Sequence, residues 1–125
     1  MAKVLIADDQ ANMRALVRLT LETGRFEIFE AHDGDAALEV ARRERPDLVF
    51  LDWTMPGTSG VEVCRALRDD PATAGARIVM LTARSQSEDR ETARAVGADD
   101  YITKPFSPIE LLEKVRDVLG PEALL

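Results

Sequence analysis

Short apolar runs alternate along the chain with longer segments in which apolar residues recur every three or four positions. The short runs are typical of β-strands, and the wider spacing is typical of helices that bury one face. Strands are therefore predicted over residues 4–7, 26–31, 47–52, 77–82 and 99–103. Helices are predicted in the segments that follow them, over residues 12–23, 35–45, 61–69, 85–96 and 108–119.

Polar caps and helix-breaking residues mark the ends of these helices. Asp35 is expected to cap the second helix, and Pro46 ends it because proline cannot donate a backbone hydrogen bond. A serine followed three residues later by a glutamate forms a capping box, which is predicted for Ser85–Glu88 and Ser107–Glu110. Glycine is expected to end the first, fourth and fifth helices, at Gly24, Gly97 and Gly120.

The alternation favours a parallel sheet, since right-handed crossovers place helices on both of its faces. Residues 47–52 hold four apolar residues between two acids, which indicates a strand covered on both sides at the centre of the sheet. The predicted fold is α/β, a doubly wound five-stranded parallel sheet with five helices. A length of 125 residues suits one domain, so residues 1–125 are expected to form a single domain.

Charge and hydropathy narrow the classes of partner. The 16 basic and 23 acidic residues give a net charge of -7, the wrong sign for duplex DNA or an anionic membrane. We therefore expect no nucleic-acid partner and no membrane partner. The apolar runs fall far short of the ~18 residues that span a bilayer, and the chain does not start like a secretory signal. A cytoplasmic location is expected. The single cysteine, Cys64, cannot form an internal disulfide and is compatible with this reducing compartment.

Polar residues stand at or directly after the carboxyl ends of four predicted strands. They are Asp8, Asp9, Asp52, Thr82 and Lys104. Each alone has an ordinary explanation as a turn cap, a strand residue or a solvated charge. Ligands of open α/β sheets, however, bind outside the carboxyl ends of the strands, so these side chains are expected to converge on one crevice.

The types of these residues indicate a magnesium site. Three carboxylates without a soft ligand form an oxygen-only site, and Mg2+ suits a site with few carboxylates, several waters and a phosphate. Lys104 directly precedes Pro105, so the peptide bond between them can be cis.

With these motifs the chain resembles the receiver domains of two-component response regulators, in particular the single-domain chemotaxis type. The resemblance runs from Lys3 to about Leu119. It rests on Asp8-Asp9, on LDWTMPGTSG at residues 51–60, on Thr82-Ala83, on Tyr101 and on Lys104-Pro105-Phe106. It implies a flavodoxin-like sheet with the strand order 2-1-3-4-5, which brings the ends of the first and third strands together.

The resemblance also implies a role for each matching residue. Asp52 would be the phosphoacceptor, Asp9 a direct Mg2+ ligand, Asp8 an acid that acts through metal-bound water, and Thr54 a ligand through its backbone carbonyl. The phosphoryl oxygens would be held by Thr82 and Lys104. Thr82 and Tyr101 would then switch the surface formed by the fourth helix, the fifth strand and the fifth helix. The donor would be a histidine kinase or phosphotransfer protein, and the output protein is not identified by the sequence.

Two alternatives belong to other functional classes. Aspartyl-phosphate phosphatases of the haloacid dehalogenase kind carry an acid/base Asp two residues after the nucleophile, where this chain has Thr54. A flavin or nucleotide binder needs a phosphate-binding loop after the first strand, where DDQANM places acids instead. A switch that is not a turnover enzyme is therefore expected. Thr54 and Arg84, which lie two residues after Asp52 and Thr82, are expected to flank the path of a hydrolytic water.

Overall fold

The computed structural model describes residues 1–83 and 87–124 and contains one five-stranded sheet. Its strands are β1 (Ala2–Ala7), β2 (Phe26–Ala31), β3 (Leu48–Asp52), β4 (Arg77–Thr82) and β5 (Asp100–Thr103). All neighbouring strands are parallel, in the order β2-β1-β3-β4-β5. This confirms the predicted sheet, and every strand lies within two residues of its expected bounds.

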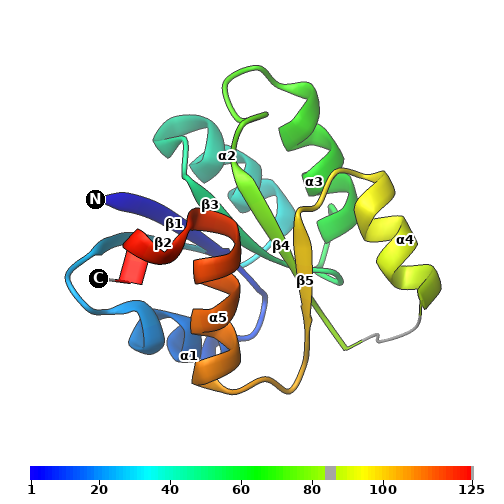
Figure 1. Cartoon of the computed structure of the whole chain (residues 1–125). Coiled ribbons are helices and arrows are strands. Elements are labelled where there is room, and N and C mark those ends of the chain that lie inside the picture. Colours follow the sequence, from blue (N-terminus) through cyan, green and yellow to red (C-terminus); the bar gives the residue numbers. More distant parts are fainter. Residues whose placement is uncertain (84–86, 125) are drawn as a thin grey trace.

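Helices cover both faces of the sheet. They are α1 (Ala11–Leu21), α2 (Gly34–Glu44), α3 (Gly60–Asp69), α4 (Ser87–Ala95) and α5 (Pro108–Leu119), followed by a short 3-10 helix at Pro121–Leu124. Figure 1 shows α1 and α5 on one face, and α2, α3 and α4 on the other. The 3-10 helix was not predicted, because Gly120 and Pro121 were expected to end the ordered helical region.

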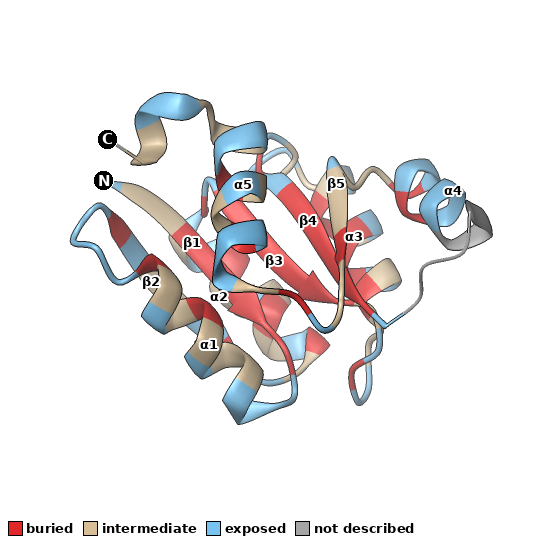
Figure 2. Cartoon of the chain, turned by 60° about the horizontal axis from the view of Figure 1, so that its bottom comes forward, coloured by how far each residue is buried: buried red, intermediate tan, exposed pale blue. Residues whose placement is uncertain are grey.

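The core consists of two apolar layers, one on each face of the sheet, because successive side chains of a strand point in opposite directions. Phe50 of β3 belongs to the layer under α1 and α5, whereas Leu51 belongs to the layer under α2, α3 and α4. All five residues of β3 are buried, as expected for the central strand. In Figure 2 the buried residues follow the sheet and the helix faces turned toward it.

The helix caps differ from the sequence prediction at one position. The carboxylate of Asp33, not that of Asp35, accepts the backbone N–H of Ala36 at 2.7 Å, so Asp33 caps α2. Asp35 is the second residue of α2, and its carboxylate accepts a hydrogen bond from the hydroxyl of Thr58 instead. The capping box of Ser107 and Glu110 is confirmed at the start of α5. The predicted box of Ser85 and Glu88 lies outside the described residues.

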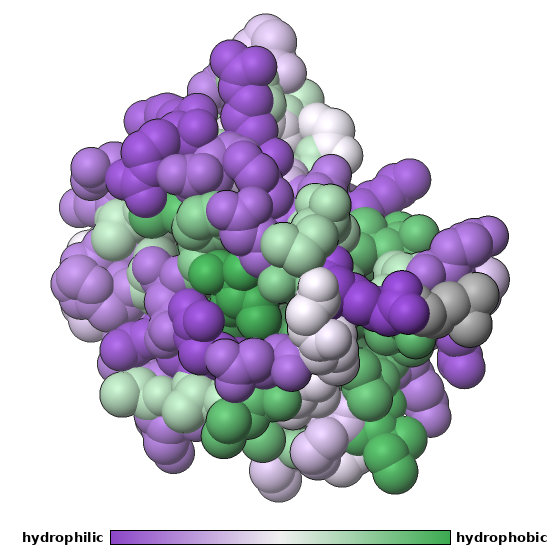
Figure 3. Space-filling model, turned by 90° about the vertical axis from the view of Figure 1, so that its left-hand side faces the viewer, coloured by the Kyte–Doolittle hydropathy of each residue, from purple (hydrophilic) through white to green (hydrophobic). Residues whose placement is uncertain are grey.

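The molecular surface is mainly hydrophilic on the side that carries both termini, with apolar side chains exposed between the charged ones (Figure 3). Cys64 is fully buried in α3, as expected for a small side chain in the core. Among the described residues, none of the helices is long and apolar enough to cross a membrane.

Candidate functional site

The carboxyl ends of four strands meet at one edge of the sheet. Asp8 and Asp9 follow β1, Asp52 ends β3, Thr82 ends β4 and Lys104 follows β5. A cleft of about 310 Å³ opens here, lined by Asp9, Gln10, Asp52, Trp53, Thr54, Thr82, Ala83 and Lys104. The convergence expected from the strand order is therefore present in the structure.

Three carboxylates cluster at this site. Asp8, Asp9 and Asp52 each offer one oxygen, and these oxygens all lie within 4.8 Å of one another. Asp8 is fully buried and Asp52 is 6% exposed, whereas Asp9 is exposed. Like charges held this close repel one another, so the cluster favours a cation.

Lys104 supplies one positive charge to this cluster. Its Nζ lies 2.9 Å from Oδ2 of Asp8 and 3.3 Å from Oδ1 of Asp52, so it bridges the ends of β1 and β3. Burial lowers the pKa of Lys104, but the contacts with Asp8 and Asp52 outweigh it and raise the pKa above its ordinary value. The lysine is therefore fully charged at neutral pH. The bond between Lys104 and Pro105 is cis.

The pKa of Asp52 is raised from 3.8 to about 6. Burial is the largest cause and the neighbouring charge of Asp8 is the next, while Lys104 opposes both. One lysine thus fails to compensate the desolvation and crowding of the carboxylates. At neutral pH, burial and the charge of Asp8 therefore disfavour the ionised form of Asp52.

The loop between β1 and α1 fixes the position of Asp8. Oδ1 of Asp8 accepts the backbone N–H of Gln10 at 2.9 Å, and the backbone carbonyl of Asp8 accepts from Arg14 at 2.8 Å. Gln10 and Arg14 were not predicted as part of the site. The position of Gln10, directly after Asp9, was a signal that it borders the cleft.

The loop between β3 and α3 also borders the cleft, through Trp53 and Thr54. Trp53 continues the pairing of β3, because its N–H donates to the carbonyl of Leu81 at 2.8 Å. Its own carbonyl accepts the N–H of Gly60 at 3.0 Å, which closes the loop. A Cβ at Gly60 would overlap the Asp52 carbonyl oxygen, so only glycine fits here. Thr54 is exposed and lines the cleft.

The two predicted switch residues lie in different surroundings. Thr82 is buried and lines the cleft. Tyr101 is half-buried and lies outside the cleft, with its ring 5.0 Å from the guanidinium of Arg90 in α4. The structure thus brings Asp8, Asp9, Asp52, Thr54, Thr82 and Lys104 together but keeps Tyr101 apart, at the contact of β5 with α4. Arg84 lies outside the described residues.

Comparison with known proteins agrees with this geometry. The sequence model of the response regulator receiver domain matches residues 4–116. The chain is 44% identical over 116 residues to the phosphate regulon transcriptional regulatory protein PhoB of Pseudomonas aeruginosa, covering 93% of this chain and 51% of that protein. It is also 44% identical over 117 residues to the transcriptional regulatory protein ResD of Bacillus subtilis, covering 94% and 48%. The chain thus spans about half the length of these curated relatives.

Solved structures show the same relationship. The chemotaxis response regulator CheY4 of Vibrio cholerae superposes with a TM-score of 0.90 at 36% identity, covering 94% of this chain and 98% of that one. The sheet order and the acidic cluster at the ends of β1 and β3 agree with the predicted resemblance. The chain belongs to the response regulator receiver domain family, whose members are phosphorylation-dependent signalling switches of two-component systems.

Proposed function

We propose that this chain accepts a phosphoryl group on Asp52 from the phosphohistidine of a histidine kinase or phosphotransfer protein, with Mg2+ bound beside it. The observation that carries the proposal is the cluster of three carboxylates within 4.8 Å, which contacts Lys104 and lies beside an open cleft that Asp9 and Asp52 line. Residues 1–125 would act as a single receiver domain, and the partner for its output would be a protein.

The residues present fit Mg2+. The candidate donors are all oxygens. Two of the three carboxylates, those of Asp8 and Asp52, are buried and share the positive charge of Lys104. Asp9, Asp52 and the Thr54 carbonyl would be direct ligands. Both oxygens of Asp8 already accept hydrogen bonds, from Gln10 and Lys104, which supports action through metal-bound water. When bound, the ion would neutralise charge and polarise the phosphoryl oxygens.

Asp52 would act as the nucleophile. A carboxylate oxygen of Asp52 attacks phosphorus, the P–N bond of the phosphohistidine breaks, and the imidazole nitrogen keeps the electron pair. A pKa of about 6 leaves Asp52 ionised, and so nucleophilic, at pH 7 and above. Lys104 and the Thr82 hydroxyl would hold the phosphoryl oxygens, since both border the same cleft.

The signal would be a surplus of negative charge. Asp8, Asp9 and Asp52 together carry -3, which Mg2+ and Lys104 neutralise, whereas an acyl phosphate of about -2 on Asp52 leaves roughly one charge uncompensated. Movement of Thr82 toward the new oxygens would leave room for the Tyr101 ring to turn inward and leave Arg90. Such a change would alter the surface formed by α4, β5 and α5 for the output protein.

Chemical labelling tests the acceptor residue. Acetyl phosphate with Mg2+ should add one phosphoryl group that hydroxylamine removes, as an acyl phosphate requires, and Asp52→Asn should abolish labelling. Asp69→Asn is the matched control, because Asp69 is an exposed aspartate of α3 away from the cleft. Labelling that persists in Asp52→Asn would contradict the assignment.

The alternative enzyme class is tested by turnover. Thr54 occupies the position where phosphatases of the haloacid dehalogenase kind carry a second carboxylate that activates water. We therefore expect p-nitrophenyl phosphate to remain intact during incubation with the protein and Mg2+. Catalytic release of nitrophenol that is lost in Asp52→Asn would favour the phosphatase.

The coupling role of Lys104 is tested by Lys104→Arg. Arginine keeps the charge but replaces a compact ammonium with a planar fork that cannot make the same point contact. The phosphorylated variant should fail to change the hydrogen exchange of α4, whereas the phosphorylated wild type should change it. An equal response in both proteins would reject the coupling role.

A further inference from the structure

The loop from Trp53 to Ser59 is anchored on the sheet at its start and on α2 near its end. At the start, the N–H of Trp53 donates to Leu81 of β4. Near the end, the hydroxyl of Thr58 donates to Oδ1 of Asp35 in α2 at 2.8 Å. Thr54 lies between these two anchors. Its position relative to the acidic cluster therefore depends on both.

The contact with α2 is close as well as polar. A Cβ at Gly34 would overlap the carbonyl oxygen of Thr58, so the loop backbone lies directly against the first residue of α2. Thr58 therefore faces a rigid helix end, which Asp33 caps. A hydrogen bond between this helix and the loop fixes the loop more firmly than a bond within the loop would.

The carbonyl of Thr54 differs from its neighbour. The Trp53 carbonyl accepts the N–H of Gly60. Within the described part of the chain, the Thr54 carbonyl accepts no hydrogen bond. Thr54 also lines the cleft. The Thr54 carbonyl is therefore free to serve as a ligand, and its orientation is set by the anchors on either side.

We infer that Asp35 and Thr58 are positioning residues: their hydrogen bond holds the β3–α3 loop so that the Thr54 carbonyl faces the divalent cation bound by Asp9 and Asp52. This inference rests on the proposed function. Asp35 touches neither the cation nor the phosphoryl group. It acts through Thr58, and it couples the start of α2 to occupancy of the metal site.

A second explanation of Asp35 is that its charge simply stabilises the first turn of α2. Substitution of Thr58 distinguishes the two explanations. If Asp35 only interacts with the helix dipole, then removal of the Thr58 hydroxyl should have no effect on the cation. If the hydrogen bond positions the loop, then Thr58→Val and Asp35→Ala should have the same effect, and the double variant should be no worse than either.

The experiment is a Mg2+ titration followed by the fluorescence of Trp53, the only tryptophan, which adjoins Thr54. Thr58→Val should raise the Mg2+ dissociation constant about threefold, as expected for a net hydrogen bond at the surface. Asp35→Asn and Thr58→Ser keep an acceptor and a donor, respectively, and should restore wild-type affinity. Thr73→Val is the matched control, because it removes a buried hydroxyl that donates to the Leu67 carbonyl at 2.8 Å, far from the cleft.

Amide hydrogen exchange of residues 53–59 in the metal-free protein provides a readout that needs no cation. Exchange should be faster in Thr58→Val than in wild type or Thr73→Val. Equal affinity and equal exchange in Thr58→Val and wild type would overturn the inference while leaving the proposed metal site intact. A titration of the wild type that shows no saturable response would overturn the metal site and this inference together.

Discussion

The two ends of the sheet each carry a polar cluster, and the two clusters differ in how well their charges and hydrogen bonds are matched. At the carboxyl ends, Asp8, Asp9 and Asp52 lie beside an open cleft, and among the described residues Lys104 is the one cation whose side chain pairs with them. At the amino ends of β4 and β5, Arg68 of α3 is matched to its partners. We interpret the first cluster as a candidate ligand-binding site and the second as a contact that stabilises the fold.

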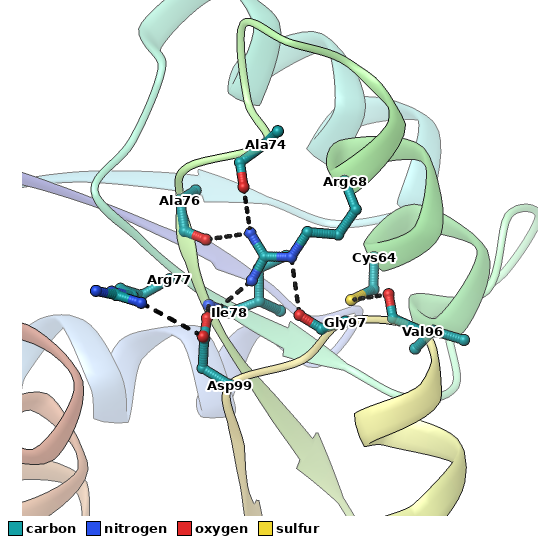
Figure 4. Close-up of polar contacts among 9 residues, drawn as sticks. All are labelled: Cys64, Arg68, Ala74, Ala76, Arg77, Ile78, Val96, Gly97 and Asp99. Atoms are coloured by element: carbon teal, nitrogen blue, oxygen red, sulfur yellow. Dashed lines mark hydrogen bonds and ion pairs between the residues drawn. The ribbon is translucent and has the colours of Figure 1, made fainter.

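The Arg68 cluster is drawn in Figure 4. Its guanidinium donates to the carbonyls of Ala74, Ala76 and Gly97 and to Oδ2 of Asp99. The same carboxylate oxygen accepts the N–H of Ile78 at 2.8 Å. Loops that precede β4 and β5 are thereby tied to the end of α3.

Charge balance explains why only one cluster is a candidate for function. The polar groups of the Arg68 cluster are paired with one another, and such a network stabilises the fold. A ligand would offer these groups no further compensation. In the acidic cluster, the raised pKa of Asp52 records an unfavourable interaction that a cation would relieve. An excess of like charge beside a cleft is thus more informative about function than the number of charged residues.

The largest effect is expected for Arg68→Ala. This change removes four hydrogen bonds and leaves Asp99 with the N–H of Ile78 and with a more distant ion-pair partner, Arg77, whose Nη1 lies 3.6 Å from Oδ1. The free energy of unfolding should fall by about 3 kcal/mol in denaturant titrations. Arg65→Ala, an exposed arginine of the same helix, is the control. A loss no greater than that of the control would remove the structural role of this cluster.

A change of opposite sign is expected for Asp52→Asn in the presence of a chelator. The pKa of Asp52 is about 6 in the folded protein and 3.8 in the reference state, so the folded state binds more protons between these values. Stability therefore falls as pH rises through this window, and the full cost is present above about pH 6. The substitution should stabilise the protein by at most about 3 kcal/mol at pH 7.5 and by little at pH 4.

Thermal or urea unfolding at both pH values measures this effect. Asp99→Asn, in the balanced cluster, should show no such gain, because Arg68 already compensates its charge. A stabilisation of Asp52→Asn that is independent of pH would mean that the raised pKa is not its cause.

Substitutions in the two clusters should differ about tenfold in their effect on the Mg2+ affinity of the protein. Asp9→Ala should weaken the Mg2+ affinity at least this much, because it removes a direct carboxylate ligand. Asp8→Ala should weaken the affinity less, and Asp99→Ala should leave it unchanged. Trp53 fluorescence reports the affinity, with a monovalent salt as the control. Superimposable curves for Asp9→Ala and wild type would show that Asp9 is not a ligand.

The last expectation concerns the reactivity of Cys64, which lies beside the Arg68 cluster, and not stability or affinity. Burial raises the pKa of its thiol to about 11, and Sγ lies 3.4 Å from the carbonyl of Val96. A disulfide reagent at pH 8 should therefore modify the folded protein far more slowly than the protein in denaturant. Modification at equal rates would contradict the buried position of the thiol.

Local sequence signals predicted the five strands, the five α-helices and the sheet edge at which the candidate site lies, but not the 3-10 helix. The apolar run of β3, bounded by acids, reflects burial on both faces, and the Ser107 capping box depends only on residues three apart. Carboxyl ends of parallel strands must meet at one edge, so Asp8, Asp52 and Lys104 could be grouped without coordinates.

Only the tertiary structure decided which groups pair across the helices. Asp33 and Asp35 are both good caps by type, and the choice between them followed from where the chain enters α2. The bonds of Thr58 to Asp35 and of Arg68 to Asp99 join residues 23 and 31 positions apart. Periodicity encodes which face of a helix is buried, but it does not encode the partner that a polar side chain meets there. That partner is fixed by the packing of whole helices on the sheet, which also sets how far each charge at the two clusters is compensated.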